Sequence, residues 1–212
     1  MRKPIWPERD HDFLVVVRKY FRGDDLAKIE FAHAMAVHAH AGQEPRHSGD
    51  PYIRHPERVA LTMIIRFRLS AEYVVLGLLH DIFEDSQHLS ADDVGKIRTA
   101  LGSDIVADLQ TLSKRYANAV HQPEGHAETN YIRTLRRASR RVQIVKMFDR
   151  LDNLSDINEA HIGAAKRERT KQTTREYFIP LANVLLSNMK RTDKYRFVVE
   201  SLEEELEQLS RA

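Results

Sequence analysis

Apolar side chains recur at three- and four-residue spacing along most of the chain, which is the period of an amphipathic helix. Gly, Pro, Ser and Asp residues interrupt these runs where helices commonly begin and end. No stretch of useful length alternates apolar and polar residues as a strand would, and no segment repeats. The pattern predicts an all-α fold with helices over residues 11–21, 26–41, 56–67, 71–85, 103–112 and 142–154, and a long helix beyond residue 166 that Pro180 kinks.

The most apolar predicted helix, over residues 71–85, ends in a cluster of polar groups. Its apolar residues cover nearly the whole circumference, so it belongs in a core. Helical spacing places Glu84 one turn beyond His80 and Asp81, with Asp85 four residues beyond Asp81. Crowded, buried carboxylates repel one another, and a divalent cation would offset their charge. The alternative is a surface helix end or a hydrogen-bonded core pair.

A loop dense in turn-forming residues precedes the predicted helix at 56–67. Pro56 suits the first position of that helix, which places His55 at its cap, where the imidazole is held rigidly. In the same loop Arg46 can stack on a base or bind phosphate, and the backbone amides at Ser48 and Gly49 can approach a ligand. The alternative is a well-ordered turn without a ligand.

A second apolar segment meets an acidic group near residue 149. Asp149 and Asn153 are four residues apart and share a helix face, although apolar residues surround them. Burial of these polar groups requires a partner. Together with His55, His80 and Asp81, Asp149 completes a plausible set of two imidazoles and two carboxylates around one ion. Mixed nitrogen and oxygen ligands favour Mn, Fe, Ni or Zn over Ca or Mg, without choosing among them.

Composition narrows the remaining possibilities. A chain of 212 residues with 42% hydrophobic content predicts a single domain over residues 1–212. The net charge of +2 gives no overall attraction to nucleic acid, and the basic clusters at 136–141 and 166–171 lack interleaved aromatics, which favours solvated helix faces over a nucleic-acid groove. Without cysteine, any metal must use nitrogen and oxygen ligands. We find no export signal and no membrane span, and expect a soluble, cytoplasmic protein.

Several separated sequence blocks form one pattern: HAGQ at 40–43, RHSGDPYIRHP at 46–56, LLHDIFED at 78–85 and KMFDRLDN at 146–153. These blocks resemble the HD-domain metal phosphohydrolases, and specifically the hydrolase domain of the bacterial Rel/Spo alarmone enzymes. They span a motif core at about 31–157, followed by C-terminal helices over 164–210. The resemblance implies a helical bundle that holds Mn²⁺ at His55, His80, Asp81 and Asp149. It also implies removal of the 3′-diphosphate of ppGpp or pppGpp, which releases pyrophosphate and GDP or GTP.

The resemblance also implies roles for residues outside the metal set. Glu84 and Asp85 match the acidic pair that positions or activates the attacking water. Arg46, Ser48 and Asn153 match positions that contact the nucleotide. The short chain resembles the free-standing small alarmone hydrolases, which implies degradation of the alarmone without synthesis.

The chain departs from the family pattern at several positions that concern the substrate. One extra residue lies between Gln43 and Arg46, Asp152 stands where the bifunctional enzymes usually have histidine, and Phe148 replaces a small residue. A basic pair of the long enzymes is replaced at 130–131. Another nucleotide substrate, such as NADPH or a nucleoside phosphate, therefore remains an alternative. A non-enzymatic nucleotide-binding module is a further alternative, against which the paired acidic residues argue, because an anion site gains nothing from added negative charge.

Overall fold

The computed structural model describes residues 12–46, 49–84, 86, 88–115, 127–159, 163–187 and 193–211. Within these ranges the regular structure is entirely helical, which confirms the predicted all-α fold. The helices are α1 (Phe13–Tyr20), α2 (Gly23–Ala39), α3 (Arg54–Phe67), α4 (Ala71–Leu79), α5 (Ala91–Leu101), α6 (Ser103–Leu112), α8 (Ala127–Arg137), α9 (Arg140–Glu159), α10 (Ala164–Thr173), the π-helical turn η1 (Thr174–Phe178), α11 (Ile179–Ser187) and α12 (Asp193–Arg211).

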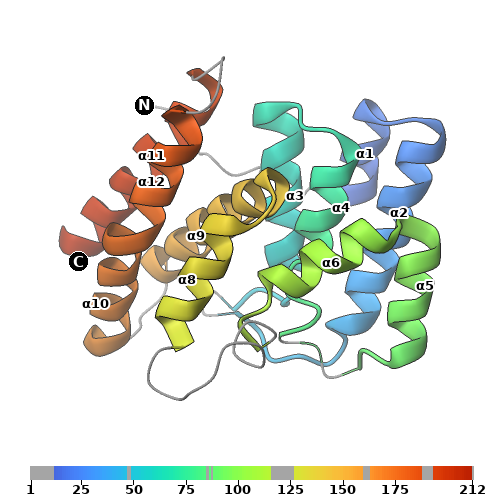
Figure 1. Cartoon of the computed structure of the whole chain (residues 1–212), viewed down its shortest axis with the longest axis horizontal. Coiled ribbons are helices and arrows are strands. Elements are labelled where there is room, and N and C mark those ends of the chain that lie inside the picture. The colour runs from blue at the N-terminus through green and yellow to red at the C-terminus, as the bar shows by residue number, and fades with distance from the viewer. Residues whose placement is uncertain are drawn as a thin grey trace.

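The helices form three groups that lie side by side (Figure 1). Helices α1, α2 and α5 lie on one side, and α10, α11 and α12 lie on the other. Between them, α3, α4 and α9 pack against one another, and α9 also contacts α11 and α12. One continuous core of buried side chains extends from Phe13 in α1 to Leu209 in α12.

Helix α4 is the most deeply buried element, as its apolar sequence predicts. Val74, Leu76, Leu78 and Leu79 are fully buried. Gly77 allows α3 to approach closely, because a Cβ atom at this position would collide with the end of the Met63 side chain. Close packing of α4 on α3 fixes the distance between the ends of these two helices.

The structure corrects two predicted helix boundaries near the polar cluster. Helix α4 ends at Leu79 rather than at residue 85, and 80–84 follow as successive turns. Helix α3 begins at Arg54, so His55 lies inside its first turn rather than at its cap. Pro56 is compatible with this start, because the first N–H groups of a helix have no partner within it.

The long helix predicted beyond residue 166 is present over 164–187, with an irregular turn just before Pro180. Helix α10 ends at Thr173, and η1 connects it to α11. Pro180 lies in the first turn of α11, directly after this π-helical turn. Proline cannot donate a hydrogen bond to the carbonyl four residues earlier, which accounts for the irregular turn at this point.

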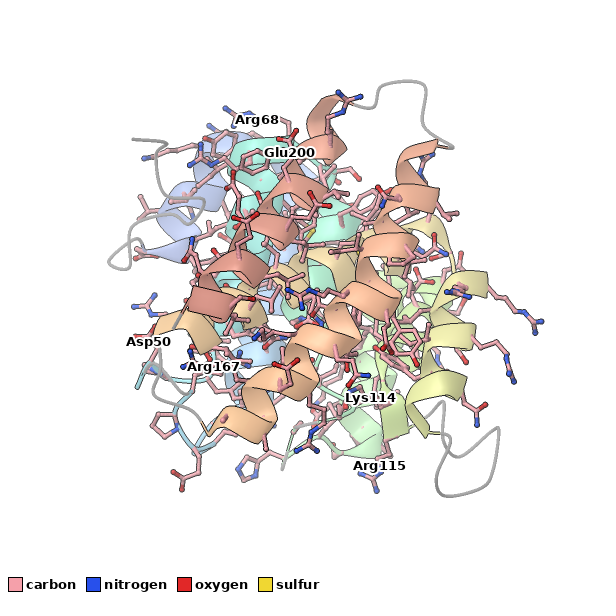
Figure 2. The ribbon with its side chains drawn as sticks, turned by 90° about the vertical axis from the view of Figure 1, so that its left-hand side faces the viewer. Asp50, Arg68, Lys114, Arg115, Arg167 and Glu200 are labelled. Carbon is pink, nitrogen blue, oxygen red and sulfur yellow. The ribbon has the colours of Figure 1, made fainter. Side chains whose placement is uncertain are left out.

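Asp50, which precedes α3, and Lys114, which follows α6, lie toward the same end of the molecule. Figure 2 looks onto the face that α10, α11 and α12 cover, and it shows Asp50, Lys114 and Arg115 toward one end. Arg68, which follows α3, lies at the opposite end together with Glu200 of α12.

Within the described ranges, no helix combines the length and the apolar composition needed to cross a membrane.

Candidate metal centre and nucleotide pocket

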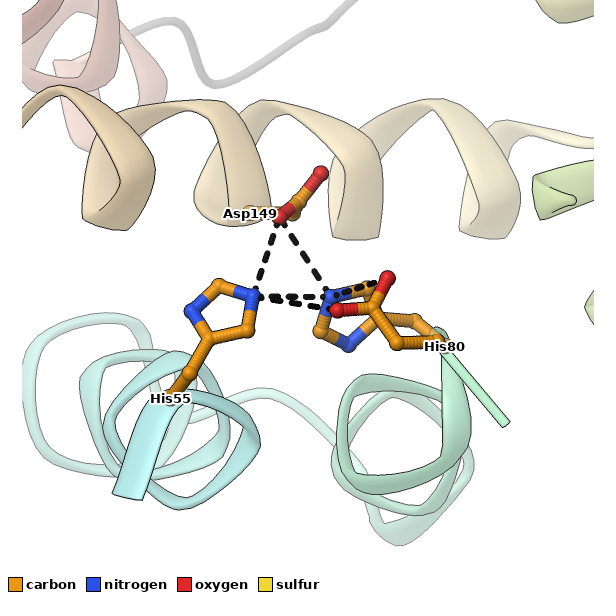
Figure 3. Close-up of side chains that lie close together, drawn as sticks. His55, His80 and Asp149 are labelled. Atoms are coloured by element: carbon orange, nitrogen blue, oxygen red, sulfur yellow. Dashed lines mark hydrogen bonds and ion pairs between the residues drawn. The ribbon is translucent and has the colours of Figure 1, made fainter. Parts of the chain in front are cut away.

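The four predicted metal ligands converge from separate parts of the fold. His55 is in the first turn of α3, His80 directly follows α4, Asp81 lies in the next turn, and Asp149 is in the middle of α9. All four are buried, and one potential ligand atom from each lies within 4.8 Å of the others. Figure 3 shows the two imidazoles facing each other below the Asp149 carboxylate.

The orientation of both imidazole rings is suited to metal ligation. The Nε2 atoms of His55 and His80 are 3.1 Å apart, and they lie 3.1 and 3.3 Å from Asp149 Oδ1. His80 Nδ1 donates to the carbonyl oxygen of Gly77 at 2.8 Å, and His55 Nδ1 contacts Asp152 Oδ2 at 2.6 Å. When Nδ1 carries the proton, the lone pair of a neutral ring is on Nε2 and points toward the centre.

The electrostatics of the site favour a cation between the carboxylates. Burial lowers the pKa of both imidazoles, but the surrounding carboxylates outweigh it and raise the pKa of His55 to about 9 and that of His80 to about 10. Burial raises the pKa of Asp81 and Asp149, but the imidazoles hold that of Asp81 well below its usual range, and Lys146 with the imidazoles does the same for Asp149. Such carboxylates need positive charge beside them, and two imidazoles with two carboxylates fit a divalent transition metal.

A ring of side chains around the four ligands fixes their orientation. Asp152 contacts His55 and also accepts from Arg58 Nε at 2.8 Å. Lys146 Nζ lies 2.6 Å from Asp149 Oδ2. Asp152 and Lys146 are not among the site residues predicted from the sequence. Lys146 and Asp152 each lie three residues from Asp149, which places the three side chains near one another on α9. This spacing is visible in the sequence.

The hydroxyl of a tyrosine completes this surrounding ring. Tyr52 donates from its hydroxyl to Asp81 Oδ2 at 2.9 Å, and its ring meets that of His55 edge-on with centroids 6.2 Å apart. Tyr52 lies just before α3 and was not predicted as a site residue. Its position three residues before His55 in the turn-rich loop gave no separate signal, because the loop has no regular period.

A cavity of about 400 Å³ contains two of the predicted nucleotide contacts. Arg46 and Asn153 line it, and Arg46 Nη2 donates to Asn153 Oδ1 at 2.5 Å. Asn153 Nδ2 in turn donates to Asp149 Oδ1 at 2.5 Å, which connects the cavity to the metal centre. The cavity is also lined by Gln43, Glu44, Pro45, Tyr52, Arg150, Ile157 and Lys166. The third predicted contact, Ser48, lies outside the described residues.

Glu84 is the described member of the predicted acidic pair. Its carboxylate accepts from the backbone N–H of Lys114 at 3.2 Å, and its own N–H donates to the carbonyl oxygen of Asp81 at 3.0 Å. The side chain is half-buried, and burial raises its pKa. The charge of Asp81 also raises it, and a carboxylate of raised pKa is suited to accept a proton. Asp85 lies outside the described residues.

Comparison with known protein families identifies the class of fold. A family model described as an HD domain matches residues 32–185. The chain belongs to the HD domain family. The match includes all four converging ligands, the cavity and the helices α10 and η1 that follow them.

Two named proteins and a solved structure are similar to the chain over most of its length. A GTP pyrophosphokinase of Myxococcus xanthus is 32% identical over 174 residues, which are 80% of this chain and 22% of that protein. The bifunctional (p)ppGpp synthase/hydrolase SpoT of Escherichia coli strain K12 is 28% identical over 172 residues, 80% of this chain and 23% of SpoT. The chain therefore spans less than a quarter of the length of these relatives.

The structural match concerns the fold. The solved structure is described as a metazoan ortholog of SpoT that hydrolyzes ppGpp and plays a role in starvation responses. It superposes with a TM-score of 0.60, covers 90% of this chain and 96% of its own, and is 20% identical in sequence.

The HD fold also places the residues that depart from the family pattern. Phe148 is buried and packs edge-on against Phe67, with ring centroids 4.8 Å apart, so it belongs to the packing between α3 and α9. Tyr131 is fully buried, and its hydroxyl donates to the carbonyl oxygen of Leu112 at 2.7 Å. Neither residue lines the 400 Å³ cavity.

Proposed function

We propose that this HD domain chain removes the 3′-diphosphate of ppGpp and pppGpp, releasing pyrophosphate and GDP or GTP. The observation that carries the proposal is the link from the four converging ligands to the cavity, through Asn153 between Asp149 and Arg46. The names of the relatives support this substrate, and the continuous core from Phe13 to Leu209 supports a single domain as the catalytic unit.

His55, His80, Asp81 and Asp149 would hold a divalent ion, which we propose is Mn²⁺. When bound, such an ion polarises a phosphoryl oxygen and lowers the pKa of coordinated water. The donor set fits this class of ion, because its two nitrogens and its carboxylate oxygens meet in a buried space. No cysteine is present in the chain to favour a softer metal.

The remaining side chains would bind the nucleotide and move the proton. Glu84, together with Asp85 by its match to the family motif, would orient the attacking water and accept its proton, so hydrolysis needs no protein nucleophile. Arg46 and Asn153 would contact the nucleotide from the cavity, joined by Ser48 from the same loop.

The proposal is tested by incubating the full chain with Mn²⁺ and, separately, ppGpp, pppGpp, GTP and NADPH. Pyrophosphate together with GDP or GTP should appear only from the first two substrates, and chelation should stop the reaction. His80→Ala should abolish turnover, whereas His88→Ala, which changes an exposed histidine, should leave it intact. Intact ppGpp alongside rapid consumption of another nucleotide would overturn the proposal.

A further inference from the structure

Tyr52 bonds to a predicted metal ligand and also packs against a predicted nucleotide contact. Its hydroxyl donates to Asp81 Oδ2 at 2.9 Å. The guanidinium carbon of Arg46 lies over its ring, 5.5 Å from the ring centroid. The same ring lines the 400 Å³ cavity.

We propose that Tyr52 is a positioning residue that couples the metal centre to nucleotide binding. Its hydroxyl fixes the orientation of the Asp81 carboxylate, and its ring holds the Arg46 guanidinium at the cavity. This inference rests on the proposed function, because it assigns a nucleotide to the cavity and an ion to the four ligands.

The Asp81 carboxylate needs an external restraint. Asp81 lies in a turn beyond the end of α4, so no helical neighbour of its own element holds it. Its Oδ1 is 3.1 Å from His80 Nε2, and its Oδ2 is 3.4 Å from His55 Nε2. A hydrogen bond from Tyr52 to Oδ2 restricts rotation of the carboxylate between these two imidazoles. Hydrogen bonds of this kind to a ligating group commonly change metal affinity about 10- to 100-fold.

The Arg46 side chain also depends on its surroundings, because it extends from a loop. Its charge is largely buried, and Asp156 Oδ2 lies 3.4 Å from its Nη2. The Tyr52 ring provides a flat surface for the guanidinium plane and attracts its charge. His40, which directly follows α2, stacks on the Tyr52 ring with centroids 4.7 Å apart and fixes the plane of that ring.

The His40 side chain is itself held in place, so it gives the Tyr52 ring a fixed surface to stack on. Its Nδ1 contacts Gln43 Oε1 at 2.7 Å, and its side chain is buried at the end of α2. The stack therefore extends from α2 through Tyr52 to Arg46, while the Tyr52 hydroxyl reaches the turn after α4. Tyr52 thus contacts both parts of the site, as Asn153 also does, and its hydroxyl and its ring have different tasks.

The two tasks are separable by substitution. Tyr52→Phe removes only the hydroxyl, whereas Tyr52→Leu removes the hydroxyl and the aromatic ring. Tyr73→Phe is the matched control, because Tyr73 packs against the core in α4 without lining the cavity. Circular dichroism melting of all variants establishes that each one folds, and Tyr52→Phe keeps the test valid if Tyr52→Leu does not.

The first measurement is Mn²⁺ titration by calorimetry on the full chain without nucleotide. We expect Tyr52→Phe and Tyr52→Leu to weaken Mn²⁺ binding about tenfold, and Tyr73→Phe to bind as the wild type does. Mn²⁺ binding by Tyr52→Phe at wild-type affinity would overturn the role of the hydroxyl.

The second measurement is the KM for ppGpp at saturating Mn²⁺. Tyr52→Phe should retain the wild-type KM, and Tyr52→Leu should raise it about three- to tenfold with a smaller change in kcat. Equal KM values for the two variants would overturn the role of the ring. If the wild-type chain leaves ppGpp intact, the proposed function fails, and the Mn²⁺ titration then decides this inference by itself.

Discussion

At the scale of single residues, the candidate metal centre depends on which nitrogen of each imidazole carries a proton. The carbonyl oxygen of Gly77 can only accept, so His80 Nδ1 must donate to it. For His55 the corresponding partner is Asp152, which two nitrogens of Arg58 also hold, at 2.8 and 3.0 Å. Arg58 Nη1 reaches Asp50 Oδ2 at 3.0 Å and so ties the loop before α3 to the same network. Asp152 therefore orients His55 although it is not itself a ligand.

Replacing Asp152 tests this orientation. Asp152→Asn removes the charge that His55 Nδ1 and Arg58 share, and we expect Mn²⁺ affinity to fall about 10- to 100-fold. Calorimetric titration with Mn²⁺ measures the change directly. Glu72→Gln is the control, because it removes a carboxylate that pairs with Arg141 at 2.9 Å on the surface. A similar loss of Mn²⁺ affinity in both variants would show that the net charge of the protein, and not the orientation of His55, causes the effect.

The raised pKa of Glu84 predicts how the rate of hydrolysis depends on pH in the acid range. Burial disfavours its carboxylate form and raises its pKa above the ordinary value of 4.5. As the proton acceptor it must be ionised, so kcat/KM should fall as the pH drops through this raised pKa. Glu84→Gln should lower kcat about 100- to 10,000-fold and remove that limb. Turnover by Glu84→Gln at the wild-type rate would refute the role, and Glu30→Gln on the exposed face of α2 serves as the control.

At the scale of helices, the site depends on how α3 and α4 pack. Helix α4 ends at Leu79, so the change from helix to turn places His80 and Asp81 beside the first turn of α3. The helical continuation predicted from spacing would instead have placed Glu84 over His80. Gly77, about one turn before His80, faces Met63 and Val59 of α3, where a Cβ atom would be in close contact.

Enlarging Gly77 should therefore loosen the packing. Gly77→Val places methyl groups against Met63 and Val59, and we expect it to lower the free energy of unfolding by about 1–3 kcal/mol. Gly95→Ala in α5 is the matched control, because its Cβ would meet no atom within 4 Å. That control should raise the free energy of unfolding by about 1 kcal/mol through helix propensity. Urea unfolding distinguishes the two, and equal stability of both variants would contradict the packing described.

At the scale of the whole molecule, the metal centre joins α3, α9 and the turns after α4, which are far apart in the sequence. An ion bound there would stabilise the folded chain, because the unfolded chain does not bring these ligands together. The C-terminal helices α11 and α12 pack on α9, the helix that carries Asp149.

This coupling predicts thermal stabilisation by Mn²⁺. At a free concentration of about 100 times Kd the gain is about 2.7 kcal/mol. For a chain of this size that corresponds to a rise in Tm of about 5–10 °C. Scanning calorimetry with Mn²⁺ and then with excess chelator should show the rise and its reversal. In His80→Ala the shift should be absent, and a full shift in that variant would place the stabilising ion elsewhere.

The sequence by itself determined the helical class and the apolar character of α4, and it named the four residues that the structure brings together. These follow from local periodicity and from the chemistry of imidazole and carboxylate groups, which act over a few residues. Spacing also paired Asp149 with Asn153, and the structure confirms their contact at 2.5 Å.

Only the tertiary structure decided where α4 ends and which side chains orient the ligands. The end of a helix depends on what its last turn packs against, and local propensity does not contain that information. The partners of His55 and Asp81 are Asp152 and Tyr52, which lie 97 and 29 residues away along the chain. Contacts across such separations arise when α3, α4 and α9 close around one core, because each helix alone leaves its polar groups without the partners that the others supply.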